Sequence, residues 1–293
     1  MKAKPVVKSE NLLGEAPLWH TIHQILYWVD IESRIVHGYE PHTGQHREWP
    51  VPQMVGTVAC ASNGNLILGL QNEIGDLDPG TGKVNTLAPL EAEMRDNRCN
   101  DGKCDPAGRF WVGTINMKSK RGAGSLYCID AALHITKVLD GLTIANGMAW
   151  SPASDLMYFI DSHDRNVKCY DFDPATPTLR NERVIINIES NNEVPDGMCV
   201  DEEGMLWIGF YGGYRVGRYD PATGKHLADV NVPAPNVTSC CFGGQDLKTL
   251  YITTARQGLP AEQLKEFPLS GSLFSCETDI AGIPGNIFGH PRE

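Results

Sequence analysis

The sequence lacks the features that mark several large classes of protein. No apolar run approaches the ~18 residues of a membrane-spanning helix, and residues 1–8 lack the apolar core of a signal peptide. We therefore expect a cytoplasmic protein. The phosphate-binding loop G-x-x-x-x-G-K-[ST], the dinucleotide fingerprint G-x-G-x-x-G and the serine-hydrolase elbow G-x-S-x-G are also missing. Their absence argues against nucleotide chemistry and against a serine nucleophile.

Positive charge is scarce as well. The 25 Lys and Arg residues are outnumbered by 36 Asp and Glu residues, and the formal net charge is −11. Such a surface repels phosphates, so we expect no nucleic-acid partner and no binding to an anionic membrane. A neutral small molecule or a cation is compatible with it. The nine cysteines include no C-x-x-C pair with zinc spacing, so we interpret most of them as buried free thiols.

A short block recurs six times along the chain. Its first residues lie 41, 45, 45, 50 and 42 positions apart. A period near 45 with strand-like content is typical of propeller blades. The six blocks are Glu15–Trp19, Gly56–Cys60, Asp101–Asp105, Asn146–Trp150, Asp196–Val200 and Thr238–Phe242. We call the first residue of each block its lead residue.

Each block is followed by a turn cluster in most repeats, by a short aromatic and β-branched segment and then by further strand-like segments, which predicts a four-stranded antiparallel meander. Six meanders predict an all-β, six-bladed β-propeller formed as one domain by residues 1–293. The last repeat shows only three clear strands, so we expect residues 5–8 to supply its fourth. The one stretch that favours a helix is residues 260–266.

The lead residues are the strongest candidates for a site. In a propeller the innermost strand of each blade lines a central channel, which brings Glu15, Asn146 and Asp196 to one mouth. All three offer oxygen donors, as hard divalent cations prefer. Asp-Gly and Asn-Gly pairs are also ordinary turn formers, so a purely structural role stays open. The polar segment Asp96–Lys103 lies beside a predicted inner strand, where Arg98 and Asn100 offer hydrogen bonds to a polyhydroxylated ligand.

Several of these segments together resemble the regucalcin/gluconolactonase family over essentially the whole chain. The Asn-Asp-Gly-Lys and Pro-Asp-Gly-Met motifs, in this order, are specific to that group. The matching segments are Gly14–Trp19, Asn97–Arg109, Ile144–Trp150, Val194–Asp201 and Thr238–Gly244.

The resemblance implies a six-bladed propeller with one divalent cation in its channel that hydrolyses sugar lactones such as gluconolactone to aldonic acids. It implies that Glu15, Asn146 and Asp196 bind the metal, with Asp196 also the general base. Arg98 and Asn100 match substrate-binding positions, and Asp101, which we group with them, matches an acidic position near the metal. Ca²⁺ is the favoured ion, with Zn²⁺, Mn²⁺, Mg²⁺ and Fe²⁺ as alternatives. We expect a monomer or a weak homodimer.

The chain departs from the pattern at one loop. Some members of the family place a sugar-contacting Glu after the second strand of the third blade, whereas residues 115–124 here contain no carboxylate and are basic. This difference leaves the identity of the sugar open. Three other functions remain: a non-catalytic calcium-binding regulatory protein, an aryl-ester or organophosphate hydrolase, and a scaffold propeller that binds partners on its faces.

Overall fold

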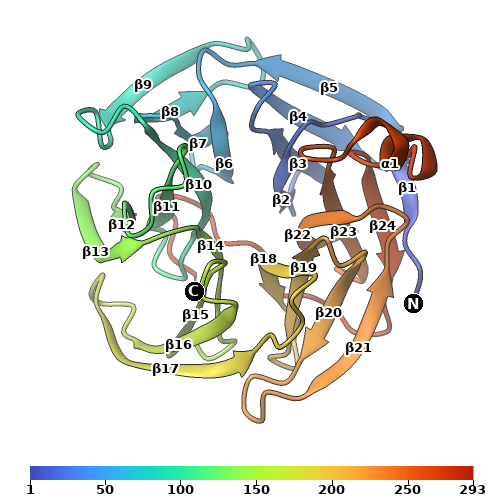
Figure 1. Cartoon of the computed structure of the whole chain (residues 1–293). Coiled ribbons are helices and arrows are strands. Elements are labelled where there is room, and N and C mark those ends of the chain that lie inside the picture. The colour runs from blue at the N-terminus through green and yellow to red at the C-terminus, as the bar shows by residue number, and fades with distance from the viewer. Residues whose placement is uncertain (293) are drawn as a thin grey trace.

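Six four-stranded antiparallel sheets surround a central axis in the computed structural model, which describes residues 1–292 (Figure 1). The all-β, six-bladed propeller predicted from the repeat is confirmed. The first three blades comprise β2 (Gly14–His20), β3 (Ile25–Asp30), β4 (Ile35–Glu40) and β5 (Gln45–Pro50); β6 (Val55–Cys60), β7 (Leu66–Leu70), β8 (Glu73–Leu77) and β9 (Val84–Pro89); and β10 (Asn97–Cys104), β11 (Phe110–Asn116), β12 (Gly124–Ile129) and β13 (Ile135–Leu142).

The other three blades follow the same order from the axis outward, except that the last one closes the ring. They comprise β14 (Ala145–Trp150), β15 (Leu156–Asp161), β16 (Asn166–Phe172) and β17 (Leu179–Asn187); β18 (Val194–Val200), β19 (Leu206–Tyr211), β20 (Arg215–Tyr219) and β21 (His226–Asn231); and β22 (Asn236–Gly243), β23 (Thr249–Ala255), β24 (Leu273–Glu277) and β1 (Lys4–Val7).

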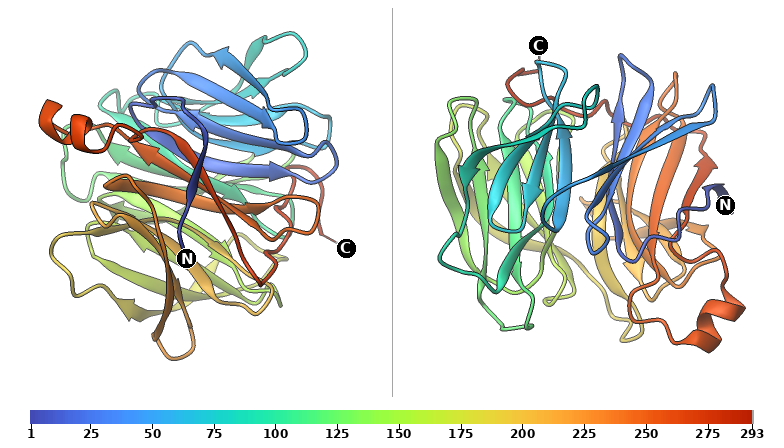
Figure 2. Two further views of the ribbon diagram at one scale, coloured as in Figure 1. Left: turned by 90° about the vertical axis from the view of Figure 1, so that its right-hand side faces the viewer. Right: turned by 90° about the horizontal axis from the view of Figure 1, so that it is seen from above.

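The predicted closure by the N-terminal strand is therefore confirmed. β1 pairs antiparallel with β24, so the first strand of the chain is the outermost strand of the last blade. This pairing gives β24 a partner on its outer side, where an unpaired edge would otherwise expose its backbone groups. The predicted helix is also present as α1 (Ala261–Glu266). Figure 2 shows that α1 projects from one face of the ring while the C-terminus lies at the opposite face.

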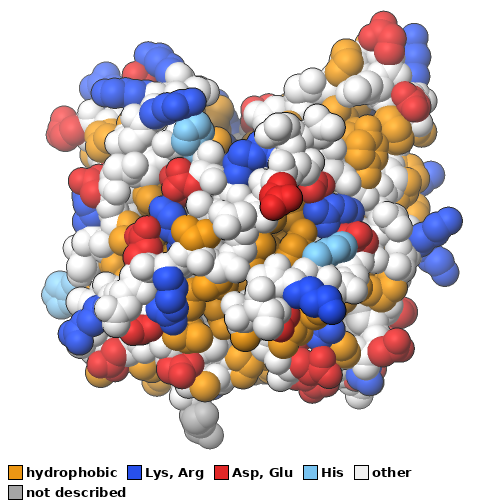
Figure 3. Space-filling model, turned by 60° about the horizontal axis from the view of Figure 1, so that its bottom comes forward, with side chains coloured by type: hydrophobic (Ala, Val, Ile, Leu, Met, Phe, Trp, Pro, Cys, Tyr) orange, Lys and Arg blue, Asp and Glu red, His pale blue; other side chains and the backbone are white. Residues whose placement is uncertain are grey.

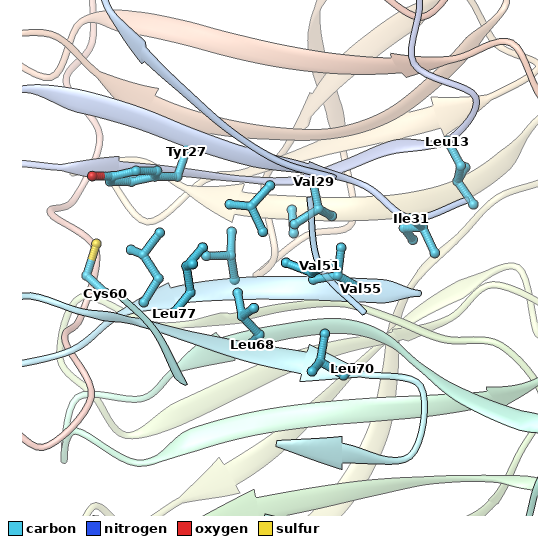
Figure 4. Close-up of a cluster of buried hydrophobic side chains, with 14 of the residues drawn as sticks. Leu13, Tyr27, Val29, Ile31, Val51, Val55, Cys60, Leu68, Leu70 and Leu77 are labelled. Carbon is cyan, nitrogen blue, oxygen red and sulfur yellow. The ribbon is translucent and has the colours of Figure 1, made fainter. Parts of the chain in front are cut away.

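Burial follows the order of strands from the axis outward. The innermost strands are almost fully buried, whereas many residues of the outermost strands are exposed. Apolar side chains fill the space between neighbouring blades. Figure 4 shows one such layer, in which Val29 of β3 and Ile31, which directly follows β3, face Leu68 and Leu70 of β7. All nine cysteines are free and buried, as expected.

Two buried aspartates tie turns and strands together within single blades. Asp105 accepts hydrogen bonds from Arg109 Nε at 2.6 Å and from Trp111 Nε1 at 2.7 Å. Asp201 occupies the corresponding turn two blades later and accepts from Trp207 Nε1 at 2.9 Å. Both carboxylates are fully buried, so these charge-assisted bonds replace the water that they lose.

The C-terminal segment after β24 forms no blade. It crosses the end of the ring opposite α1 (Figure 2), and its residues form hydrogen bonds with several blades. Phe288 pairs with Cys60 and Ser62 through the backbone, and Asn286 Nδ2 donates to the carbonyl of Cys104 at 2.9 Å. Residues 283–286 of this segment line a pocket together with the ends of several innermost strands, whereas Glu15, Asn146 and Asp196 line a separate cavity.

No helix within residues 1–292 combines the length and the apolar character needed to cross a bilayer. Figure 3 shows acidic and basic side chains dispersed over one face of the molecule rather than gathered into a field of one sign.

Candidate metal centre in the channel

The lead residues occupy an irregularity that all six innermost strands share. The pairing of each innermost strand with its neighbour shifts at the lead position, which is the signature of a β-bulge. Bulges bend a strand and re-aim side chains, and they are common next to active sites. Here the bulges interrupt the regular alternation of side chains between the two faces of the sheet. This interruption allows Glu15, Asn146 and Asp196 to face the channel.

Close packing around the axis explains the glycines that follow three of the lead residues. A Cβ atom on Gly147 would lie 2.5 Å from the carbonyl oxygen of Asp196 in the next blade. Only glycine allows the two innermost strands to approach so closely. Asn146 and Asp196 are consequently brought together by backbone contact between neighbouring blades.

Aspartates at the ends of second strands fix the chain just before two lead residues. Asp30 accepts hydrogen bonds from the backbone N–H groups of Leu12 and Leu13 at 2.8 and 3.0 Å, two residues ahead of Glu15. Asp161 does the same for Thr143 and Ile144, ahead of Asn146. The entry to each inner strand is thus held by its own blade, which orients the metal-ligand candidates.

Five of the six predicted site residues line one cavity at the mouth of the channel: Glu15, Arg98, Asn100, Asn146 and Asp196. All five are less than a tenth exposed. The sixth, Asp101, lies buried behind this lining, and its carboxylate accepts the N–H of Gly102 at 2.7 Å. Its role in substrate binding stays a prediction.

Crowding of carboxylates in this dry environment perturbs their ionisation. Burial, followed by the negative charges of Asp196 and Asp101, raises the pKa of Glu15 well above its ordinary value. Burial and the charge of Asp101 raise the pKa of Asp196 to about 8, although hydrogen bonds to Asn146 and Glu15 oppose the shift. Without a cation, the carboxyl groups of Glu15 and Asp196 therefore stay protonated to a higher pH than an exposed carboxyl group does.

The donor set fits a divalent cation. Asn146 Oδ1 and Asp196 Oδ1 are buried and have no hydrogen-bond partner within residues 1–292. Asn146 Nδ2 donates to Ser162 Oγ at 3.0 Å, and Ser162 Oγ donates to the carbonyl of Pro195 at 2.7 Å. The amide is thus locked with its nitrogen engaged and its oxygen free. Buried oxygens without partners are costly unless a ligand satisfies them.

Arg98 and Asn100 form a rigid donor unit beside these oxygens. Arg98 Nη1 donates to the carbonyl of Cys99 and to Asn100 Oδ1, both at 2.8 Å, and Asn100 Nδ2 donates to the carbonyl of Ala145 at 2.9 Å. Burial lowers the pKa of Arg98 to about 10, against the opposing influence of Glu15, so the guanidinium stays charged at neutral pH.

The basic loop after β11 contributes to the outer wall of the cavity. Met117, Ser119 and Arg121 line it, whereas Lys118 is held away by an ion pair with Asp96 at 2.8 Å. Neither this wall nor Ser162, His163 and Tyr211, which line the cavity from other blades, was predicted from the sequence. None of them occupies a repeated position, so the period carried no signal for them.

Comparisons with known proteins show the family and the fold of the chain. A sequence model of the SMP-30/Gluconolactonase/LRE-like region matches residues 13–256. A protein named regucalcin from Bos taurus is 35% identical over 290 residues, covering 97% of each chain. A solved structure described as the calcium-binding protein regucalcin from Agrobacterium tumefaciens superposes with a TM-score of 0.94 at 27% identity, covering 98% of this chain and 97% of that one. A luciferin-regenerating enzyme superposes with a TM-score of 0.91 at 30% identity, covering 98% of both chains.

Proposed function

The chain belongs to the SMP-30/gluconolactonase/LRE-like family, and from this premise we propose that it is a divalent-cation-dependent lactonase that opens sugar lactones to aldonic acids. One observation carries the proposal. Two buried carboxylates and a buried amide line a cavity that also presents a fixed arginine and asparagine, and within residues 1–292 the buried oxygens Asn146 Oδ1 and Asp196 Oδ1 have no hydrogen-bond partner.

Glu15, Asn146 and Asp196 would hold the cation. When bound, it supplies a Lewis acid that polarises the lactone carbonyl and stabilises negative charge on the carbonyl oxygen. All-oxygen donors favour a hard ion, and the relative described as a calcium-binding protein makes Ca²⁺ our first choice. Binding of the ion requires Glu15 and Asp196 to lose the protons that burial otherwise retains.

The residues of the chain then position the substrate. Within residues 1–292, Arg98 makes its protein hydrogen bonds through Nη1 alone, which leaves Nε and Nη2 as donors for sugar hydroxyls. Asn100 retains its second amide N–H for the same purpose. Because both side chains are anchored by protein contacts, they orient the ring at little cost in conformational entropy.

Asp196 is our choice for the proton transfer. As the water oxygen bonds to the carbonyl carbon, Asp196 accepts a proton from that water. The bond between the carbonyl carbon and the ring oxygen then breaks, and the same proton returns to the ring oxygen, which becomes a hydroxyl of the open aldonic acid. No covalent enzyme intermediate is required. We attribute a factor of about 10²-fold to this transfer.

Chelation and metal restoration test the proposal. The stripped protein is assayed with a panel of aldonolactones, and Ca²⁺, Mg²⁺, Mn²⁺, Zn²⁺ and Fe²⁺ are then restored singly. We expect chelator-sensitive ring opening above the spontaneous rate, and we expect Asp196→Ala to abolish it and to weaken cation binding. Near-normal turnover in Asp196→Ala would exclude the assigned role.

The names of the relatives favour a second candidate, a calcium-binding protein without catalysis. The same experiment separates the two. A non-catalytic protein binds Ca²⁺ in a calorimetric titration, yet no lactone of the panel opens faster with the loaded protein than without it.

A further inference from the structure

A second group of metal-ligand side chains lies outside the channel, on the outer hairpin of the first blade. His37 belongs to β4, and His46 and Glu48 belong to β5, the outermost strand. His37 and Glu48 are directly opposed in the register of the two strands. His46 precedes Glu48 by two residues, so its side chain emerges on the same face of the sheet.

One ligand atom from each of these side chains faces the same point. His37 Nδ1 lies 3.0 Å from His46 Nε2 and 3.6 Å from Glu48 Oε1, and His46 Nε2 lies 4.0 Å from Glu48 Oε1. Tetrahedral zinc with bonds of about 2.0–2.1 Å holds its ligand atoms roughly 3.3 Å apart. The three spacings surround this value, so shifts of a few tenths of an ångström suffice to admit an ion.

Trp28 fixes the orientation of both imidazoles. Its ring centroid lies 4.7 Å from that of His37 and 5.3 Å from that of His46, with interplanar angles of 8° and 9°. Both imidazoles therefore lie parallel to the indole, and they meet through their nitrogens rather than through their faces. The preorganised pair needs little ordering to bind an ion.

Exposure increases across the cluster, so an ion can enter from solvent. The side chain of His37 is 2% exposed, that of His46 24% and that of Glu48 50%. His37 is the buried ligand, and Glu48, the most exposed of the three side chains, can adjust to the ion.

We propose that His37, His46 and Glu48 form a second metal site, which takes Zn²⁺ or another borderline transition-metal cation. Its two nitrogen donors distinguish it from the all-oxygen channel centre, which favours hard cations. Bound metal would tie the exposed strand β5 to the buried side of its blade. His37 Nε2 is buried without a partner within residues 1–292, so we expect binding about 10–100-fold weaker than at a site whose histidines have their second-shell hydrogen bonds.

The two metal sites can be tested separately because one has nitrogen donors and the other has only oxygen donors. The full chain, without a histidine tag, is saturated with Ca²⁺ and titrated with Zn²⁺ under equilibrium dialysis, and separately with one equivalent of Cu²⁺ for electron paramagnetic resonance. We expect Zn²⁺ to bind and to raise the melting temperature, and we expect Cu²⁺ to show nitrogen hyperfine couplings from two imidazoles. His46→Gln should bind one equivalent of Zn²⁺ fewer per chain and lose these couplings.

His42→Gln is the matched control, because His42 is exposed in the turn of the same hairpin and takes no part in the cluster. It should bind Zn²⁺ like the wild type. Lactone opening with Ca²⁺ should be unchanged in both variants, which separates this site from the channel. Equal Zn²⁺ stoichiometry and equal Cu²⁺ spectra in the wild type and His46→Gln would overturn the proposal, as would the same loss in His42→Gln.

Discussion

Removing one carboxylate from the channel should stabilise the metal-free protein, and the effect should grow with pH. In the folded chain without a cation, burial and Asp101 raise the pKa of Asp196 to about 8. In the unfolded chain the pKa of an aspartate is about 3.9. Between these values the folded state keeps a proton that the unfolded state has lost, so the free energy of unfolding falls as pH rises.

The size of the effect follows from the same two values. Between the two pKa values, each unit of pH lowers the free energy of unfolding of the wild type by about 1.4 kcal/mol because of this one proton. Asp196→Asn has a neutral side chain of the same shape that does not titrate, so its free energy of unfolding does not fall with pH for this reason. The two proteins should therefore be equally stable near pH 4, and the variant should be more stable by up to about 5 kcal/mol at pH 7.5.

Urea denaturation followed by tryptophan fluorescence, in a chelator and at several pH values from 4 to 7.5, measures this difference. Comparing the two proteins cancels the contributions of groups that do not interact with residue 196. Saturating Ca²⁺ should reverse the order, because the cation binds the ionised wild-type site and stabilises the folded state. A metal-free wild type as stable as the variant at pH 7.5, or an order that Ca²⁺ leaves unchanged, would refute the reasoning.

Three further variants test other parts of the structure. Asp105→Ala should lower the free energy of unfolding by about 3–5 kcal/mol in urea, because the largely buried Arg109 loses its ion-pair partner and Trp111 Nε1 loses its acceptor. Gly147→Ala should weaken Ca²⁺ binding at least tenfold by calorimetry, because its Cβ meets the carbonyl of Asp196 at 2.5 Å and separates two ligands. Arg121→Ala should raise KM for lactones and leave kcat unchanged, because this side chain lines only the outer wall of the cavity.

The fold and the metal-ligand candidates were predictable because both depend on a repeated position. Each blade requires an innermost strand with a bulge at the same place, so a period near 45 fixes the strands and singles out the lead residues, among them Glu15, Asn146 and Asp196. Closure of the ring by β1 was predictable for a similar reason. The last repeat lacked one strand, and the N-terminal segment was the one strand-like stretch without a partner.

Residues outside the repeat gave no comparable signal. Ser162, which locks Asn146, lies in a turn after β15 and looks like an ordinary strand end in sequence. Asn286 bonds to Cys104 across 182 residues, so the course of the C-terminal segment depends on a contact that no local pattern contains. Asp101 shows that the repeat can also mislead. It is an acidic lead residue, yet it is not among the residues that line the cavity.

The histidine cluster of the first blade lies outside the repeat, but the geometry of its hairpin determines which of its side chains meet. Glu40 and Gln45 flank the turn and pair with each other, so residues equally far from them along the two strands must oppose one another, as His37 and Glu48 do. His46 then shares the face of Glu48 through the two-residue alternation of a strand. A turn therefore fixes which side chains of a single blade meet, whereas the period identifies only what all blades share. Sites that depend on one blade have to be sought in the register of its hairpins.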